Sequence, residues 1–220
     1  MIAAWPSPAG GEYALAFDKG RKARLLVLPA LFDEGNKTRR LAAETMRRLA
    51  GAGIDSFLPD LPGCNESLAP LEDQTLASWR AAAQDAARHF APTHVLTIRA
   101  AATLAPPALP GWRYAPTGGA PALRALLRAR TISAREAGDE VTGEALLEAG
   151  RVQGLELAGY RIGAAMIRDL EAAMLPDSGR LTDISQATVG GPAPWLRAEP
   201  GFDPAQADAL AAVLVLGLNR

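Results

Sequence analysis

Apolar residues in this chain form short unbroken runs, separated by longer segments in which apolar residues recur at helical spacing. Unbroken runs cover 23–28, 54–61 and 93–98, as is typical of strands buried on both faces in a parallel sheet. The segments between them predict two helices, of which 74–90 is the second. Two successive strand–helix–strand units predict an α/β fold, with a mostly parallel central sheet and helices on both faces. The first helix carries one apolar stripe, made of Leu41, Ala42, Thr45, Met46 and Leu49.

Outside this core the pattern is weaker. Residues 5–11 are rich in proline and glycine, so we expect a loop or tail there, followed by an edge strand at 13–17. One helix face is predicted from the apolar residues between Ile162 and Met174, and a final helix from Pro204 onward. We treat 132–178 as a possible cap-like insertion. Further strands are expected at 111–116, 152–157 and 181–185, and further helices at 100–105, 121–130 and 143–150.

Length and composition are those of an ordinary globular chain. Its 220 residues fit one domain, 1–220, with 49% hydrophobic and 21% charged residues. The net charge of −1 gives no reason to expect nucleic acid as a partner. The single cysteine, Cys64, fits a reducing compartment. We expect a cytoplasmic protein without a membrane span, because no signal peptide is visible and the most apolar run, 209–218, is shorter than the about 20 residues that a span needs.

Charged residues gather directly after the first buried strand. The segment 29–40 reads Pro-Ala-Leu-Phe-Asp-Glu-Gly-Asn-Lys-Thr-Arg-Arg. We expect its polar residues to lie in a loop at the carboxyl end of the strand, where open α/β sheets bind their ligands. The alternative is that these side chains only keep the surface of the following helix in water. The candidate ligand-binding residues of this segment are Asp33, Glu34, Asn36, Lys37 and Arg39.

A second candidate site is the turn after the strand at 93–98. Many α/β enzymes carry a nucleophilic serine where a strand turns sharply into a helix, within the pattern G-x-S-x-G. The five positions here are Thr97, Ile98, Arg99, Ala100 and Ala101, so an arginine stands where the serine would be. Since Thr97 and Ala101 replace the two glycines, we expect the backbone of this turn to be less strained.

Segments 29–40 and 60–67 resemble motifs of a known family, the exosortase A system-associated hydrolase 2 group of α/β-hydrolase-like proteins. Residues 29–40 are similar to the family motif PFxEEMNKSRR. Residues 60–67, which read Asp-Leu-Pro-Gly-Cys-Asn-Glu-Ser, are similar to DLxGCGDS, with Asn for the second Gly and Glu for the second Asp. A tryptophan follows about a dozen residues later, as Trp79 does here.

Later segments extend the resemblance over most of 13–200. Residues 155–160 are similar to the family segment V-A-G-Y, and 191–195 loosely match G-x-P-F-W. The family's elbow is similar to G-L-R-x-G, which makes an arginine at position 99 a feature of the family. The resemblance implies an α/β-hydrolase-like fold and a role linked to bacterial PEP-CTERM protein sorting and exopolysaccharide loci.

Ser-His-Asp catalysis is not expected from these residues. Arg99 does not give up its proton at any useful pH, and the two histidines, His89 and His94, are expected to be structural. Cys64 follows a strand at the edge of the sheet where such folds place their sites. It is a candidate nucleophile if Arg99 or Lys37 lowers its pKa. The alternative is an inert buried cysteine. No spacing of His, Cys, Asp and Glu suggests a metal, and no cofactor is implied.

For Arg99 two interpretations remain open. Together with Lys37 and Arg39 it would clamp a small anionic or sugar-like ligand. Alternatively it forms an internal ion pair with Asp33, Glu34 or Asp60 that braces the loops. The complete set of candidate ligand-binding residues is Arg99, Asp33, Glu34, Asn36, Lys37, Arg39, Asp60 and Asn65.

The sequence thus supports two main hypotheses about function. The first is a catalytically degenerate α/β-hydrolase-like protein that acts as a binding or accessory factor. The second is a hydrolase of an ester or thioester, with Cys64 as nucleophile or with a water activated by Glu34, Asp33 or Asp60, and with Arg99 stabilising the oxyanion. A third possibility is a homo-oligomer assembled through the insertion at 132–178.

Overall fold

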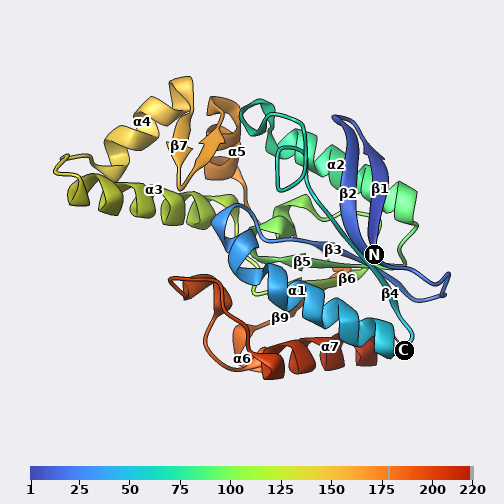
Figure 1. Cartoon of the computed structure of the whole chain (residues 1–220). Coiled ribbons are helices and arrows are strands. Elements are labelled where there is room, and N and C mark those ends of the chain that lie inside the picture. Colours follow the sequence, from blue (N-terminus) through green and yellow to red (C-terminus); the bar gives the residue numbers. More distant parts are fainter. Residues whose placement is uncertain (178, 219–220) are drawn as a thin grey trace.

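A seven-stranded sheet forms the centre of the protein, for which a computed structural model describes residues 1–177 and 179–218 (Figure 1). The strands lie in the order β1-β2-β4-β3-β5-β6-β9. All pairs from β4 to β9 are parallel, whereas β1 and β2 run antiparallel to their neighbours, so the predicted mostly parallel sheet is confirmed. The strands are β1 Ile2–Ser7, β2 Gly10–Phe17, β3 Arg24–Leu28, β4 Asp55–Pro59, β5 His94–Ile98, β6 Gly111–Tyr114 and β9 Leu181–Ile184.

The three predicted apolar runs form the middle of this sheet as β3, β4 and β5. Every residue of β4 is buried, and the last four residues of β3 and of β5 are buried as well. Successive side chains of β3 point to opposite faces of the sheet. Leu26 belongs to the same apolar cluster as Trp79 on one face, and Leu25 to the same cluster as Met46 on the other. Burial on both faces explains why these strands show no alternation of polar and apolar residues.

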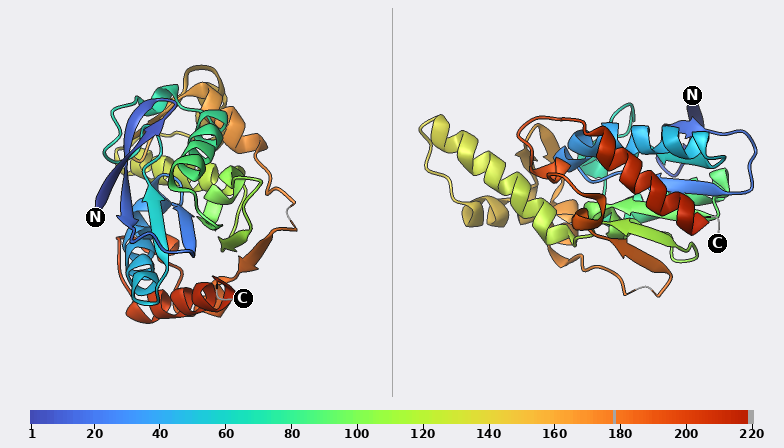
Figure 2. Two further views of the ribbon diagram at one scale, coloured as in Figure 1. Left: turned by 90° about the vertical axis from the view of Figure 1, so that its right-hand side faces the viewer. Right: turned by 90° about the horizontal axis from the view of Figure 1, so that it is seen from below.

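Helices cover both faces of the sheet (Figures 1 and 2). Helices α1 Asp33–Gly51 and α7 Pro204–Leu218 lie side by side on one face. On the other face lie α2 Leu76–Phe90 and the 3₁₀ helix η2 Arg99–Leu104. Within the described part of the chain, no helix combines the length and the apolar character needed to cross a membrane.

The loop expected at 33–37 is instead the first turn of α1. Asp33 and Glu34 lie in that turn, where carboxylates interact favourably with the positive end of the helix dipole. Thr38 and Leu41 are buried, so the buried face of the helix begins close to its first residue. The candidate residues from Asp33 to Lys37 are therefore held on a helix, which is more rigid than the predicted loop.

The first residues of the chain also differ from the prediction. Instead of a loop or tail, they form β1, which pairs with β2, so that β2 is not an edge strand but lies between β1 and β4. Trp5 explains the difference, because it is buried, contacts Phe90 and donates its indole Nε1–H to the carbonyl oxygen of Tyr13. Packing of one large aromatic side chain outweighs the proline and glycine content of the segment.

Between β6 and β9 the chain leaves the sheet and builds a small group of helices and strands that includes a two-stranded sheet, β7–β8 (Figure 1). The predicted insertion, 132–178, begins within the last turns of α3, and its last residue, 178, lies outside the described residues. Ile162 belongs to β8 and Met174 is exposed, so only the middle of the predicted helix face 162–174 forms α5. The elements are α3 Gly119–Glu136, α4 Gly143–Gln153, β7 Leu155–Leu157, β8 Tyr160–Ile162 and α5 Ala164–Ala172; the short helices elsewhere are η1 Leu71–Asp73, α6 Gln186–Val189 and η3 Pro194–Leu196.

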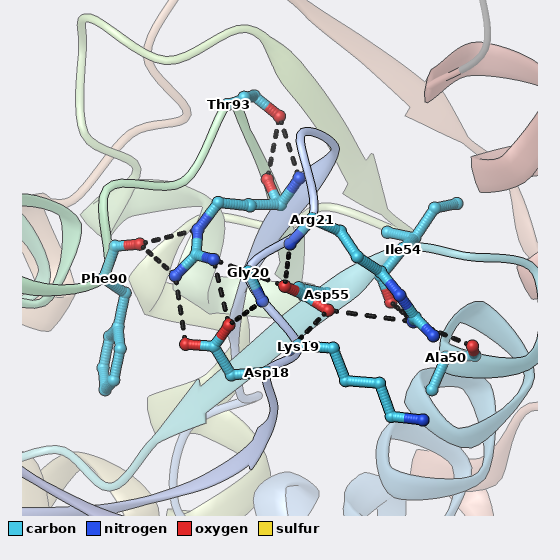
Figure 3. Close-up of polar contacts among 10 residues, drawn as sticks. Asp18, Lys19, Gly20, Arg21, Ala50, Ile54, Asp55, Phe90 and Thr93 are labelled. Carbon is cyan, nitrogen blue, oxygen red and sulfur yellow. Dashed lines mark hydrogen bonds and ion pairs between the residues drawn. The ribbon is translucent and has the colours of Figure 1, made fainter.

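A buried carboxylate, Asp55, joins several elements at the amino end of the sheet (Figure 3). It accepts hydrogen bonds from the backbone N–H groups of Lys19 (3.1 Å) and Arg21 (2.8 Å) and from Nη1 of Arg24 (3.3 Å). Arg24 in turn binds Asp18 and the last carbonyl oxygen of α2. A buried charge is tolerated only when it is paired and hydrogen-bonded in this way, so Asp55 fixes the turn between β2 and β3 against β4.

We expect Asp55→Ala to destabilise the fold by about 3–5 kcal/mol, because it leaves buried N–H groups and arginine charge without their partner. Urea unfolding followed by circular dichroism measures the loss. The matched control is Asp18→Ala, which removes a carboxylate that also binds Arg24 but is 44% exposed, and which should cost no more than about 1 kcal/mol. Equal effects of the two substitutions would contradict this account of Asp55.

Candidate functional site

Arg99 occupies the sharp turn between β5 and η2. Its φ is 56°, in the left-handed region that is uncommon for residues other than glycine. The expectation that Thr97 and Ala101 relax this turn is therefore wrong. Both of these residues are buried, as are Ala100 and Ala102, so the packing of the strand and of η2 holds the backbone at Arg99 in its strained conformation.

The Arg99 side chain is held by three groups from different parts of the chain. Its Nε and Nη2 donate to the two carboxylate oxygens of Glu34, at 3.1 and 3.2 Å, and Nη1 donates to the carbonyl oxygen of Ala115 at 2.8 Å. The guanidinium also lies 4.3 Å from the ring centroid of Trp195. Since the Arg99 and Glu34 side chains are only 17% and 13% exposed, this is a largely buried two-point ion pair.

The other charged candidates are paired as well. Lys37 Nζ lies 2.7 Å from Asp33, and Arg39 Nη1 lies 3.1 Å from the buried Asp60. Asn65 Nδ2 donates to the same Asp60 oxygen at 2.6 Å. Each of the three candidate cations thus has its own carboxylate, and the cations do not form a joint clamp. This arrangement corresponds to the ion-pair interpretation of Arg99, with Glu34 as the partner among the three carboxylates considered.

A cavity of about 80 Å³ lies beside this group, at the carboxyl ends of β3 and β4. Asn36, Arg39 and Asn65 are among its lining residues, whereas the other candidates, Arg99, Asp33, Glu34, Lys37 and Asp60, are not. The carboxyl end of β5, next to β3, is occupied by the Arg99–Glu34 pair. The full lining is Pro29, Ala30, Leu31, Phe32, Gly35, Asn36, Arg39, Leu61, Gly63, Cys64, Asn65, Trp79 and Tyr160.

Two aromatic residues at this site were not among the candidates. Tyr160, from β8, accepts a hydrogen bond from Asn36 Nδ2 at 2.8 Å and contacts the ring of Phe32 edge-on. Trp195, from η3, covers the guanidinium of Arg99. Both lie in segments that resemble later motifs of the family, V-A-G-Y and G-x-P-F-W. Those two resemblances were therefore the available signal for residues that are far from Arg99 in sequence.

Cys64 is an unpaired cysteine in the lining of the cavity. Burial raises its pKa to about 12, and the nearby carboxylates of Asp60 and Glu12 act in the same direction. Arg99 and Lys37, one of which would have to lower this pKa for Cys64 to act as a nucleophile, are bound to carboxylates of their own. The thiol is therefore protonated at neutral pH, whereas a nucleophilic cysteine needs the thiolate.

The histidines lie away from Arg99. His94 is the first residue of β5, at the opposite end of the strand, and stacks on Trp112 with burial lowering its pKa. His89 lies in the last turn of α2. No imidazole is thus available as a base at the elbow. Among residues 1–177 and 179–218, no three His, Cys, Asp or Glu side chains are grouped in a way that would hold a metal ion.

Comparisons with known proteins give likeness in structure only. No protein-family model matches the chain, and no match was found among curated proteins. The solved structure of alpha/beta hydrolase domain-containing protein 10 from mouse superposes with a TM-score of 0.56 and 12% identity, covering 100% of this chain and 98% of that one. Alpha/beta hydrolase GrgF from Penicillium sp. sh18 gives a TM-score of 0.51 at 12% identity, over 78% of this chain and 72% of that one.

Other likenesses are partial: the chain spans 52% and 61% of two solved structures from Agrobacterium vitis S4 and Agrobacterium tumefaciens, at TM-scores of 0.42 and 0.43 and identities of 16% and 13%. Identities this low inform about the fold and not about activity. The strand order, the helices on both faces and the likeness to two hydrolases over most of the chain show that this protein has the α/β-hydrolase fold.

Proposed function

We propose that this protein is a catalytically degenerate α/β-hydrolase-like protein that acts as a binding or accessory factor. The observation that supports it most directly is the pairing of Arg99 with Glu34 at the elbow. Acyl transfer needs a nucleophile, a base within hydrogen-bonding distance and donors for the oxyanion. At this elbow the side chain is a permanent cation, and the carboxylate beside it is bound at both oxygens.

The family resemblance supplies the proposed biological context. The motifs at 29–40 and 60–67 contribute Glu34, Arg39 and Asp60, which form the ion pairs of this site. Under the proposal, the protein serves PEP-CTERM sorting or exopolysaccharide production by binding a ligand or partner rather than by breaking a bond. The cavity, with Asn36, Arg39, Asn65 and Tyr160, is the proposed ligand site, and the segment 132–178, which carries Tyr160, is its proposed cap.

The alternative is hydrolysis of an ester or thioester, and the contacts at the site favour it less. The raised pKa of Cys64 opposes a thiolate mechanism. A water activated by Glu34 would pass its proton to this carboxylate, and the buried guanidinium of Arg99 would then be left without a counter-charge. Asp60 accepts hydrogen bonds from Arg39 and Asn65 at one oxygen, Oδ1, so its charge is also paired with an arginine.

We expect the native protein to show no turnover of short-chain p-nitrophenyl esters or acyl thioesters above the uncatalysed rate. Arg99→Ser, which restores a hydroxyl at the elbow, should be equally inactive because both histidines lie elsewhere. Spectrophotometric assay of the released nitrophenol or thiol measures the rate. Turnover by the native protein that disappears in Cys64→Ala or Glu34→Gln would refute the binding proposal and establish the alternative.

The reactivity of Cys64 gives a second test, because it is the chain's single cysteine. With a pKa of about 12, only about 0.01% of the thiol is ionised at pH 8, against roughly a quarter for an ordinary cysteine. Alkylation by iodoacetamide should therefore be slow in the folded protein and should keep accelerating above pH 9. The control is the same protein in urea, where the rate should level off above its ordinary pKa of about 8.5. A folded-state midpoint below pH 8 would indicate an activated thiol.

A further inference from the structure

We infer that the cavity beside Tyr160 accepts a small uncharged polyhydroxy compound, such as a three-carbon polyol or one edge of a sugar ring, in preference to an anion. The inference rests on the proposed function, since it assigns a ligand class to the site proposed there. Three features of the lining carry it: the hydrogen-bonding groups that it leaves available, the balance of its charges, and its size.

The polar groups of the lining offer both donors and acceptors: besides the hydroxyl of Tyr160, the side chains of Asn36, Asn65 and Arg39 have N–H groups beyond those used in their hydrogen bonds. Asn36 Nδ2 donates to the Tyr160 oxygen, so the hydroxyl proton of Tyr160 is free to be donated, and no acceptor for it is found among the described residues. The amide oxygen of Asn36 also has no partner within that part of the chain. Asn65 donates its amide to Asp60 and keeps its own oxygen. A hydroxyl group both donates and accepts, so it suits this mixture better than a carboxylate, which only accepts.

The charges around the cavity do not favour an anion. Arg39 is the one lysine or arginine in the lining, and its charge is balanced by Asp60 at 3.1 Å. The Tyr160 hydroxyl and the Cys64 thiol of the lining both lie near carboxylates. Burial raises the pKa of Tyr160, and Asp33 raises it further, while Asp60 and Glu12 add to the effect of burial on the pKa of Cys64. The paired charges therefore leave no unbalanced cation in the lining that would favour a carboxylate or phosphate over a neutral ligand.

The size and the apolar part of the lining limit the ligand to one small unit. About 10–15 Å³ is enough for one water molecule, so about 80 Å³ accommodates roughly five to eight non-hydrogen atoms, which is the size of a three-carbon polyol or of one edge of a sugar ring. Phe32 lies between Trp79 and Tyr160, with ring centroids 5.4 and 5.7 Å away, and forms an aromatic wall. Aromatic and apolar side chains with a few polar groups are the usual lining of a small-molecule site, and this lining suits a ligand with a C–H face and hydroxyl edges.

Ligand-observed NMR with paired probes tests this inference. The pairs are glycerol against D-glycerate and D-glucose against D-glucuronate, which differ in a carboxylate. We expect saturation transfer to the neutral member of at least one pair, with an affinity at least about threefold higher than that of its acid.

Tyr160→Phe keeps the ring and removes the hydroxyl donor. It should weaken binding of the neutral ligand about fivefold to tenfold, as expected for one hydrogen bond. Tyr13→Phe, on β2 and outside the lining, is the matched control and should not change it.

Two outcomes would overturn the inference. One is tighter binding of glycerate or glucuronate, lost in Arg39→Gln, which would make the cavity an anion site. The other is the absence of binding by all four probes at tens of millimolar, with the native fold verified by circular dichroism. Either result leaves the proposed non-hydrolytic function standing if the ester assays stay negative. Ester turnover, in contrast, would refute that function whatever the probes do.

Discussion

The buried ion pair between Arg99 and Glu34 is the interaction on which the arrangement of this site depends. It connects the end of β5 to the first turn of α1, and through the carbonyl of Ala115 and the ring of Trp195 it reaches two further segments. Arginine binds a carboxylate through two parallel hydrogen bonds and stacks on aromatic rings, which a lysine at this position would not reproduce. Removal of either partner would leave a charge in a largely desolvated place, so neither residue is free to change alone.

This pair also explains where the cavity lies. In open α/β sheets, ligands bind where the strand order reverses, which here is between β3 and β5. The carboxyl end of β5 is filled by a guanidinium and its partners, and the remaining cavity is formed at the ends of β3 and β4. Its lining combines aromatic rings with amide and hydroxyl groups, and its charges are paired. The fold thus has a concave site at the ends of β3 and β4, while the side chain at the turn after β5, Arg99, is bound to Glu34.

Much of the fold was predictable because burial on two faces leaves a clear pattern. The apolar runs that became β3, β4 and β5 and the stripe of α1 are direct consequences of contact with the core. Strand β1, which pairs with the predicted strand β2, was missed because the burial of Trp5 against the distant Phe90 stabilises a segment of otherwise turn-forming residues. Local propensity carries no information on such a contact.

The site was predictable in composition but not in pairing. The sequence analysis placed Arg99, Glu34, Arg39 and Asp60 at one edge of the sheet. Which carboxylate pairs with which cation depends on the directions of the side chains, and the spacing of residues in the sequence does not determine these directions. Tyr160 and Trp195 reach the site from 61 and 96 residues beyond Arg99, and only their motif resemblance pointed to them. The positive φ at Arg99 was missed because the replacement of the two flanking glycines by Thr97 and Ala101 was taken as a sign of a relaxed turn, whereas tight packing holds Arg99 in this conformation.

A double-mutant cycle between Arg99 and Glu34 is the most direct measurement of the central claim, that the elbow side chain is a structural partner of Glu34. The cycle compares the unfolding free energies of the native protein, Arg99→Met, Glu34→Gln and the double variant. The account predicts that the double variant loses less stability than the two single losses added together, by at least about 1 kcal/mol. Additive losses, with a coupling energy near zero, would contradict it and would mean that Arg99 is free to act on other groups.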